Sequence, residues 1–386
     1  MKRRDFLSAA AAAGVAILAP RFAVAQGTAT GYSQLLVLVE LKGGNDGLNT
    51  VVPYADPAYY AVRPRIAIRR DDVLQLDVRT GLHPSLAPLM PLWQSRELAI
   101  VQGVGYPSPN LSHFRSIEIW DTASRAEEYL ADGWLARAFA AAPVPKRFAA
   151  DGVVVGASEL GTLAGSGARA VALANTEQFL RQAKLAQPAR GEGNRALAHL
   201  LKVEADVVQA AAGLNGNREF RTQFPQGPFG NAVKTAAQVV ASEAGVAAVR
   251  ISLNGFDTHQ NQPGTHANLL RQLAEGLVAL RAALQELGRW DSTLVVTYAE
   301  FGRRPQENGS SGTDHGTAAA HFALGGRVKG GLYGEAPRLD RLEGGNLGHA
   351  VDFRSVYATV LERWWGVPAA GPLGGRFPPL DLVKPV

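Results

Sequence analysis

The chain has 386 residues, contains no cysteine and carries a formal charge of +5 at pH 7. Without thiols it forms no disulfides and no thiolate metal sites, so oxygen and imidazole groups must supply any metal ligands. The first 25 residues account for +3 of the charge and leave +2 for the rest. A charge this small, with no basic cluster, gives no reason to expect nucleic acid as a partner.

The first 25 residues, MKRRDFLSAAAAAGVAILAPRFAVA, predict an export signal. Arg3-Arg4 followed by Asp5-Phe6-Leu7 resembles a twin-arginine signal, and Ala23-Val24-Ala25 fits a cleavage site before Gln26. The apolar run between them is short for a membrane span. We expect a signal peptide over 1–25, export by the twin-arginine translocase, a periplasmic or secreted product and no transmembrane anchor after cleavage. An ordinary secretory signal or an uncleaved anchor is the alternative.

Strand and helix patterns alternate along the rest of the chain. In chain order they are a strand at 35–39, a helical pattern at 82–96, a strand at 97–104, a helix at 112–123, glycine-rich strands and loops over 151–190, a helical insertion around 191–244, a strand at 246–253, a helix at 266–288, a strand at 293–298 and a helix at 352–366. The strands are unbroken apolar runs, which is typical of strands covered on both faces. The alternation predicts a single α/β domain over 26–386, with a mainly parallel sheet and helices on both faces.

Polar residues follow each of the four apolar strands, or the loops directly after them. In parallel sheets ligands bind at the carboxyl ends of the strands, so we expect these residues to converge there. Mixed carboxylate and imidazole ligands suit one or two divalent ions: Zn²⁺, Mn²⁺, Mg²⁺ or Ca²⁺. The candidate metal ligands are Asp46, Asp257, His259, Glu300, Asp314 and His315.

Ser112 is the candidate nucleophile, because a hydroxyl at a helix N-terminus lies where backbone N–H groups attract an anion. Arg115, Arg303 and Arg304 are candidate clamps for phosphate or sulfate, whose geometry matches the guanidinium fork. The remaining histidines considered lack acidic residues at useful spacing and are expected to be structural: His83, His199, His266 and His321.

Each polar cluster also has a structural interpretation. Asn45-Asp46-Gly47 is good turn chemistry, and Ser112 is a suitable helix N-cap. Asp257 and His259 could form a hydrogen-bonded pair within a loop, and Glu300 could form a surface ion pair with Arg303. The segment GTDHGTAAAH, residues 312–321, could be a polar turn that leads into a helix.

Five long segments resemble the bacterial exported family described as domain of unknown function 1501. They run from about residue 35 to 366: ELKGGNDGLNTVVPYADPAYYAVRPRIAI, NLSHFRSIEIWDT, GFDTHQNQ, AEFGRRPQENGSSGTDHG and DFRSVYATVLERWWG. This family in turn resembles a branch of the alkaline phosphatase and sulfatase superfamily. The resemblance implies a three-layer α/β/α sandwich with a two-metal site at the strand ends. It also implies metal ligands at Asp46, Asp257, His259 and His315, and a nucleophile at Ser112.

The sequence departs from the superfamily pattern after the strand at 293–298. Glu300-Phe301 stands where the pattern has Asp-His, so one metal site is expected to be weakened, to hold a harder ion or to be lost. Asp314 is a possible replacement, or it orients a neighbouring ligand from outside. The segment SHFR lacks both the cysteine and the proline of the formylglycine signature, which argues against that sulfatase chemistry.

We therefore expect a metal-dependent hydrolase of phosphate or sulfate esters that uses Ser112 or a metal-bound hydroxide as nucleophile. Its substrate would be a small-molecule or polysaccharide ester, with Arg115 and Arg303 on the ester anion. The alternative is a non-catalytic periplasmic or envelope binding protein with a degenerate metal site, and Phe301 is its best support. A phosphomutase or transferase is a third possibility. Fold resemblance alone does not choose among them.

Overall fold

The computed structural model describes residues 31–175 and 218–385, with single positions between them at 178, 206, 210, 213 and 214. The predicted signal peptide, residues 1–25, lies outside the described residues. Of the helical insertion predicted around 191–244, most of the part that precedes residue 218 also lies outside them. The described residues belong to one compact unit, Gly31–Val386. None of its described helices combines the length and the apolar character that a membrane span requires.

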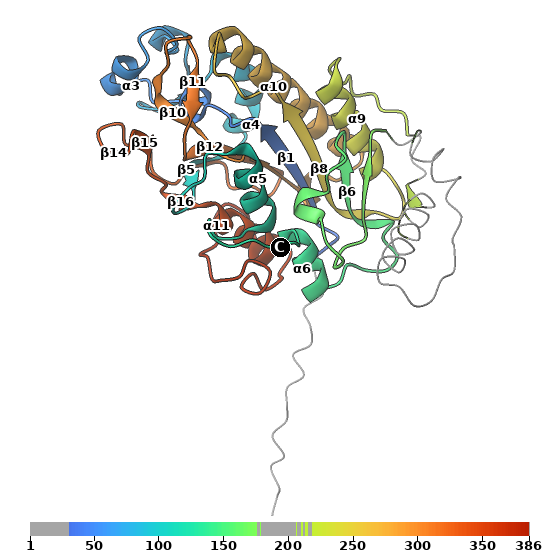
Figure 1. Ribbon diagram of the computed structural model, residues 1–386. Coiled ribbons are helices and arrows are strands. Elements are labelled where there is room, and N and C mark those ends of the chain that lie inside the picture. Colours follow the sequence, from blue (N-terminus) through green and yellow to red (C-terminus); the bar gives the residue numbers. More distant parts are fainter. Residues whose placement is uncertain are drawn as a thin grey trace, which may run out of the picture. The chain divides into compact units, whose positions relative to one another are not determined.

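A nine-stranded sheet forms the centre of the described unit, in the order β13-β5-β12-β9-β1-β8-β6-β7, with β16 beside β5 (Figure 1). The middle strand β1 pairs in parallel with β8 on one side and β9 on the other. Strand β12 is antiparallel to both of its neighbours, β5 and β9. The prediction of a mainly parallel sheet is therefore confirmed. Its strands are β1 Leu35–Lys42, β5 Leu98–Gly105, β6 Ala150–Val155, β7 Ala170–Leu173, β8 Val246–Asn254, β9 Thr293–Tyr298, β12 Ala319–Leu324, β13 Gly331–Tyr333 and β16 Val351–Asp352.

Helices and small sheets surround the central sheet. The helices are α2 Gly47–Thr50, α3 Pro57–Val62, α4 Met90–Gln94, α5 His113–Thr122, α6 Trp134–Ala141, α9 Pro228–Val240, α10 Gln262–Glu286 and α11 Phe353–Ala358, which continues into a π-helical turn, Thr359–Trp364. The small sheets are β2 Val51–Val52 with β4 Gly81–Leu82 and β3 Leu74–Gln75, β10 Arg303–Glu307 with β11 Thr313–His315, and β14 Leu342–Glu343 with β15 Asn346–Leu347.

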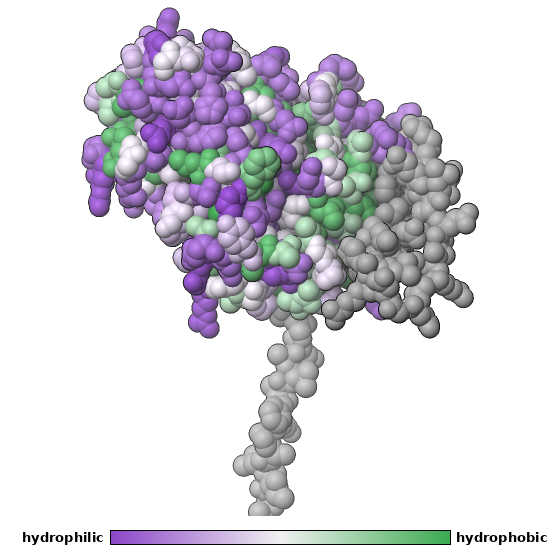
Figure 2. Space-filling view, in the orientation of Figure 1, coloured by the Kyte–Doolittle hydropathy of each residue, from purple (hydrophilic) through white to green (hydrophobic). Residues whose placement is uncertain are grey.

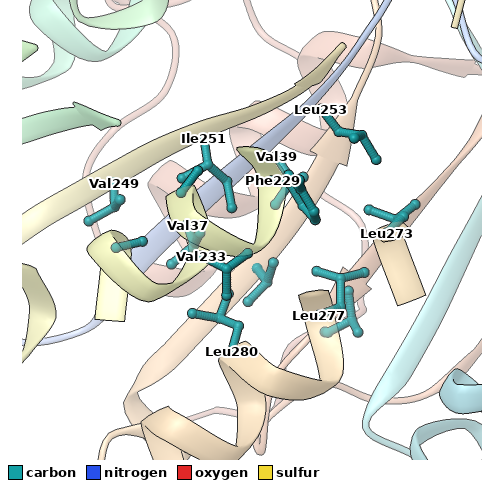
Figure 3. Packing of buried hydrophobic residues seen from close by; sticks show 14 of the residues in the cluster. Val37, Val39, Phe229, Val233, Val249, Ile251, Leu253, Leu273, Leu277 and Leu280 are labelled. Atoms are coloured by element: carbon teal, nitrogen blue, oxygen red, sulfur yellow. The ribbon is translucent and has the colours of Figure 1, made fainter. Parts of the chain in front are cut away.

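Alternate residues of β1 enter two separate hydrophobic cores. Val37 and Val39 pack on the side of α9 and α10, where Phe229 and Leu277 contribute (Figure 3). Leu36, like Leu38, belongs to the core that α5, α6 and α11 cover. Side chains of a strand alternate between faces, so an unbroken apolar strand is buried from both sides. The result is the expected three-layer α/β/α arrangement.

Strand β12 differs from one interpretation of the sequence. Alanine favours helices, and residues 312–321 were compatible with a turn leading into a helix. Instead Ala319–Leu324 forms a strand between β5 and β9, where all six side chains are buried. Its place inside the sheet overrides the local propensity. The helical pattern predicted at 82–96 is only partly α-helical. Because proline lacks a backbone N–H, a 3-10 helix, Pro84–Leu89, forms before the short α4.

Three neighbouring strands bring the predicted polar loops together. The chain leaves β9, β1 and β8 at the same edge of the sheet, because the three strands are parallel and adjacent. Helix α5 begins close to this edge and packs against the sheet face that carries Leu36 (Figure 1). The loops after these strands and the start of α5 build the candidate site.

Candidate metal centre

Three side chains from distant parts of the sequence converge at the strand ends. His113 is the first residue of α5, Asp257 follows β8, and His315 is the last residue of β11. One potential ligand atom from each lies within 4.8 Å of the other two. Asp257 Oδ2 is 3.4 Å from His113 Nε2, and Asp257 Oδ1 is 3.2 Å from His315 Nε2. This spacing is compatible with one shared cation.

Both imidazole rings are held by their other nitrogen. His315 Nδ1 donates to the carbonyl of Leu111 at 2.8 Å, and His113 Nδ1 donates to Glu300 Oε1 at 2.8 Å. A carbonyl and a carboxylate only accept, so each Nδ1 carries the proton. Burial lowers the pKa of His315, which keeps its Nε2 a free lone pair. Metal-ligating histidines characteristically donate their second nitrogen in this way.

The hydrogen bond to Glu300 raises the pKa of His113. A second proton, on Nε2, would face Asp257 Oδ2 at 3.4 Å. Metal binding generally displaces such protons from its ligands. His113 Nε2 has no hydrogen-bond partner among the described residues, which leaves it available to a cation.

His259 and Asp314 extend the cluster toward solvent. His259 Nε2 lies 2.9 Å from His315 Nε2 and 3.1 Å from Asp257 Oδ1, so it can act as a further ligand. Asp314 Oδ1 lies on the far side of that ring, 3.4 Å from His259 Nδ1, and also accepts a hydrogen bond from Asn308. Asp314 is therefore placed to orient His259 from outside rather than to reach the shared point itself.

Glu300 is buried where the chain leaves β9. Its Oε1 accepts from the backbone N–H of Gly43 at 2.9 Å and from His113. Its Oε2 is buried and has no hydrogen-bond partner in the described part of the chain. A buried carboxylate oxygen without a partner is costly, so a bound cation or water is its natural complement.

Asp257 remains ionised because of Arg303. Burial alone would raise the pKa of Asp257, but the hydrogen bond and the charge of Arg303 outweigh it and hold the pKa at about 2. Arg303 Nη2 donates to Asp257 Oδ1 at 2.7 Å, while Nε and Nη1 donate to the carbonyls of Gly44 and Thr313. Its side chain is fully buried. The placement differs from the expected anion clamp: Arg303 ties three loops together and positions Asp257.

Asp46 lies outside the cluster. Its carboxylate caps α2 by accepting from Leu48 N and forms two hydrogen bonds to Arg63, at 2.6 and 2.9 Å. Gln262 Nε2 donates to the same carboxylate at 2.5 Å. Burial would raise the pKa of Asp46, but the Arg63 charge lowers it overall. With both oxygens engaged, Asp46 organises the first loop instead of offering a free oxygen to a metal.

Arg115 is also occupied within the protein. Its Nη2 donates to the carbonyls of Ala126 and Glu128, and its guanidinium stacks over the ring of Tyr129. Its side chain is buried, so it anchors the loop after α5 rather than lying free beside an ester. Arg115 therefore holds a loop of the protein and is not the free clamp that the sequence predicted. Its sequence spacing did not indicate these contacts.

Ser112 occupies the N-cap position of α5, but its side chain makes no capping hydrogen bond. It is exposed, and both of its chain neighbours touch the cluster, Leu111 through its carbonyl and His113 through its ring. The hydroxyl is therefore available at the margin of the site.

The sequence patterns did not identify His113 as a candidate metal ligand. They singled out the neighbouring Ser112 instead, because of its hydroxyl at the helix start. The available signal was an imidazole at the start of the helix that follows the second apolar strand. Phe301, which replaces the expected histidine, packs its ring 4.9 Å from that of His113 and 4.5 Å from that of His315. A buried phenyl ring thus supports two imidazoles, one of them from α5.

The donor set fits a divalent ion. Two or three imidazole nitrogens and one ionised carboxylate favour a transition metal such as Zn²⁺ or Mn²⁺ over Mg²⁺ or Ca²⁺. The partnerless His113 Nε2 is an atom that such an ion would satisfy. A cavity of about 640 Å³ lies beside the cluster, and His113, Asp257 and Glu300 contribute to its wall.

The fold defines an α/β protein with a mainly parallel sheet, and the site adds a candidate metal centre at the strand ends. A family model described as "Protein of unknown function (DUF1501)" matches residues 67–367, so the chain belongs to that family. A search of curated proteins gave no match to the sequence.

Solved structures with a similar fold include the PsFucS1 sulfatase from Pseudoalteromonas sp., with 11% identity and a TM-score of 0.42 over 90% of this chain and 70% of that one. The C-terminal periplasmic domain of EcEptC from Escherichia coli, in complex with Zn, has 11% identity and a TM-score of 0.37 over 76% and 72%. Alkaline phosphatase from the Antarctic bacterium TAB5 has 10% identity and a TM-score of 0.34 over 78% and 94%. These scores are low, so the chemistry of this chain must be inferred from its own residues.

Proposed function

We propose that this protein is a metal-dependent hydrolase of phosphate or sulfate esters. The single observation that carries the proposal is the convergence of His113 Nε2, His315 Nε2 and the Asp257 carboxylate on one point, with each imidazole held from behind. The exposed hydroxyl of Ser112 beside this point supplies a candidate nucleophile. In the net reaction a water oxygen bonds to phosphorus or sulfur, and the ester oxygen leaves as an alcohol that takes up a proton.

The protein's own residues have distinct roles in this proposal. His113, Asp257 and His315 would hold the ion, with His259 or Glu300 completing the set. When bound, a divalent ion supplies positive charge that stabilises the ester anion and lowers the pKa of a hydroxyl. Arg303 keeps Asp257 ionised, while Glu300 keeps the His113 proton on Nδ1.

The test is turnover of an ester panel by metal-loaded wild type and a Ser112→Ala variant. The panel contains p-nitrophenyl phosphate and p-nitrophenyl sulfate, assayed with Zn²⁺ or Mn²⁺ and after chelation. We expect turnover that needs the metal and falls by about a hundredfold or more in Ser112→Ala if Ser112 is the nucleophile. Ser33→Ala, an exposed serine at the other end of β1, is the matched control.

A second candidate is a protein that binds a cation and an ester without turning it over. The observation in its favour is that Arg115 and Arg303, the two arginines expected on the ester anion, are both engaged within the protein. Metal binding of wild-type strength, together with no Ser112-dependent turnover of any ester in the panel, would select this candidate.

We further propose export by the twin-arginine route to the periplasm or the medium, on the sequence of residues 1–25 alone. The substitution Arg3→Lys with Arg4→Lys should retain the precursor in the cytoplasm, while the single substitution Lys2→Arg should not. Cell fractionation with an antibody to the protein measures both. Normal export of the double variant would exclude the twin-arginine route.

A further inference from the structure

A second cavity, of about 400 Å³, lies beside the metal centre along the sheet. It shares five wall residues with the cavity at the cluster: Glu40, Lys42, Ile117, Glu159 and Asn254. The two cavities are therefore contiguous, and a molecule at the metal centre can extend into the second one.

The sheet face under this second cavity changes character along the strands. On β1 the face that begins with Leu36 and Leu38 continues with Glu40 and Lys42, since alternate residues share a face. On β8 the residues directly beside these two are Ser252 and Asn254. A face that is apolar in its first half and polar in its last is unusual in a core, and the change falls where the cavity lies.

Glu40 is the group that most needs an explanation. Its side chain is 2% exposed, and its Oε2 accepts from Arg250 at 2.8 Å and from Ser252 at 2.6 Å. Its Oε1 is buried and has no hydrogen-bond donor among the described residues. Asp121 Oδ1, in the wall of the same cavity, is also without a donor in the described part of the chain. Unmet buried acceptors are rare and mark a missing partner.

The charges around the second cavity limit which chemical group can donate to these unmet acceptors. A simple anion would be repelled by Glu40, and a simple ammonium group would satisfy the acceptors but lie close to Lys42 and Arg250. A neutral group with several hydroxyls meets both requirements, because each hydroxyl donates to an acceptor such as Glu40 Oε1 and accepts from a donor such as Asn254 Nδ2.

The first cavity, beside the metal centre, has an apolar wall on the side of α5. Phe114 is 89% exposed, which is exceptional for a phenylalanine, and Ile117 lies three residues on, on the same side of the helix. Figure 2 shows hydrophobic residues exposed on this face of the molecule amid a mostly hydrophilic surface. An exposed aromatic ring in the wall of the first cavity, next to the polar second cavity, is suited to stack on the C–H face of a ring-shaped polyol.

We propose that the two cavities bind the alcohol part of the substrate as a polyhydroxylated ring, with Glu40 and Asn254 on its hydroxyls and Phe114 on its face. The substrate would then be a phosphate or sulfate ester of a sugar or a similar cyclic polyol. This assignment rests on the proposed hydrolase function, but the binding of the free alcohol does not depend on turnover.

The test measures binding of the free alcohols to the metal-loaded protein by saturation-transfer NMR. The probes are glucose, galactose and inositol. Cyclohexanol, a neutral ring with only one hydroxyl, and choline, a cation, are the control compounds. We expect at least one polyol to bind, and Phe114→Ala and Glu40→Gln each to weaken it about tenfold, the effect of one lost stacking or charged contact. Val78→Ala, an exposed apolar residue in neither cavity, should leave binding unchanged.

The same variants separate this proposal from the hydrolase proposal. If p-nitrophenyl esters are hydrolysed but no polyol binds, or choline alone binds, the polyol subsite is wrong and the hydrolase stands. Polyol binding that is unaffected by both Phe114→Ala and Glu40→Gln also overturns the subsite. Polyol binding that both variants weaken supports it, even if no ester in the panel is turned over. Circular dichroism of Glu40→Gln, compared with Phe114→Ala on the exposed rim, detects misfolding at the buried position.

Discussion

At the scale of single residues, the site depends on side chains whose partners are far apart in sequence. Arg63 engages Asp46, and Arg303 joins loops that follow β1 and β8. The sequence revealed which residues have the right chemistry and which strand ends they follow. It did not reveal which carboxylates were already paired, because pairing is set by tertiary packing. Asp46 was therefore expected as a ligand and His113 was not.

His113→Ala should lower the affinity for Zn²⁺ by at least about tenfold, since it removes one nitrogen ligand and the proton donor to Glu300. Isothermal titration calorimetry measures the Zn²⁺ affinity, with protein from which a chelator has first removed any bound metal. His349→Ala, an exposed histidine outside the cluster, is the control and should bind Zn²⁺ like wild type. Equal affinities for all three proteins would remove His113 from the site.

Arg303→Lys should destabilise the protein by about 3 kcal/mol, because a lysine cannot replace the guanidinium contacts to Gly44, Thr313 and Asp257 at once. Urea unfolding with and without Zn²⁺ measures the change. If Arg303 instead clamps the ester, the KM of p-nitrophenyl phosphate should rise while the free energy of unfolding stays at the wild-type value.

At the scale of elements, the strongest predictions were the strands that lie inside the parallel sheet. The apolar run at 293–298 coincides with β9, and the run at 35–39 is the first part of β1. These strands are buried from both faces, so composition alone identifies them. Strand β12 was harder, because Ala319, Ala320 and His321 carry no strand signal of their own. The loops between strands are also unpredictable in detail, although they decide where ligands point.

One glycine controls how two of these loops meet. Gly43 has a φ of +115°, and a Cβ at this position would lie 2.4 Å from the backbone nitrogen of Asp257. Gly43→Ala should cost at least about 1 kcal/mol of stability and move Asp257, so that Zn²⁺ affinity falls as well. Thermal unfolding and calorimetry measure the two effects. Gly309→Ala, where a Cβ meets open space, should change neither.

At the scale of the whole molecule, the three-layer fold buries titratable groups away from the metal centre. His321 in β12 is fully enclosed, and neither of its ring nitrogens has a hydrogen-bond partner among the described residues. Burial lowers its pKa to about 3, whereas burial raises the pKa of Asp121 to about 7. The two groups act on stability in opposite directions as pH falls, so a single variant is needed to isolate one of them.

His321→Leu should protect the protein in acid. An unfolded histidine takes up a proton below about pH 6.5, while folded His321 does so only near pH 3, so the wild type loses stability as pH falls through that window. The difference in unfolding free energy between His321→Leu and wild type should grow by about 1.4 kcal/mol per pH unit from pH 6 to pH 4. Urea unfolding at several pH values measures it. A difference that is constant with pH would show that His321 is not buried as a neutral group.

In the proposed function one divalent ion binds between α5 and the ends of β8 and β11. Metal-edge anomalous scattering from crystals grown with Zn²⁺ tests it most directly, because the signal identifies both the element and its ligands. We expect a zinc peak in contact with His113, Asp257 and His315. The absence of a peak there, or a zinc ion bound instead at Asp46, would contradict it.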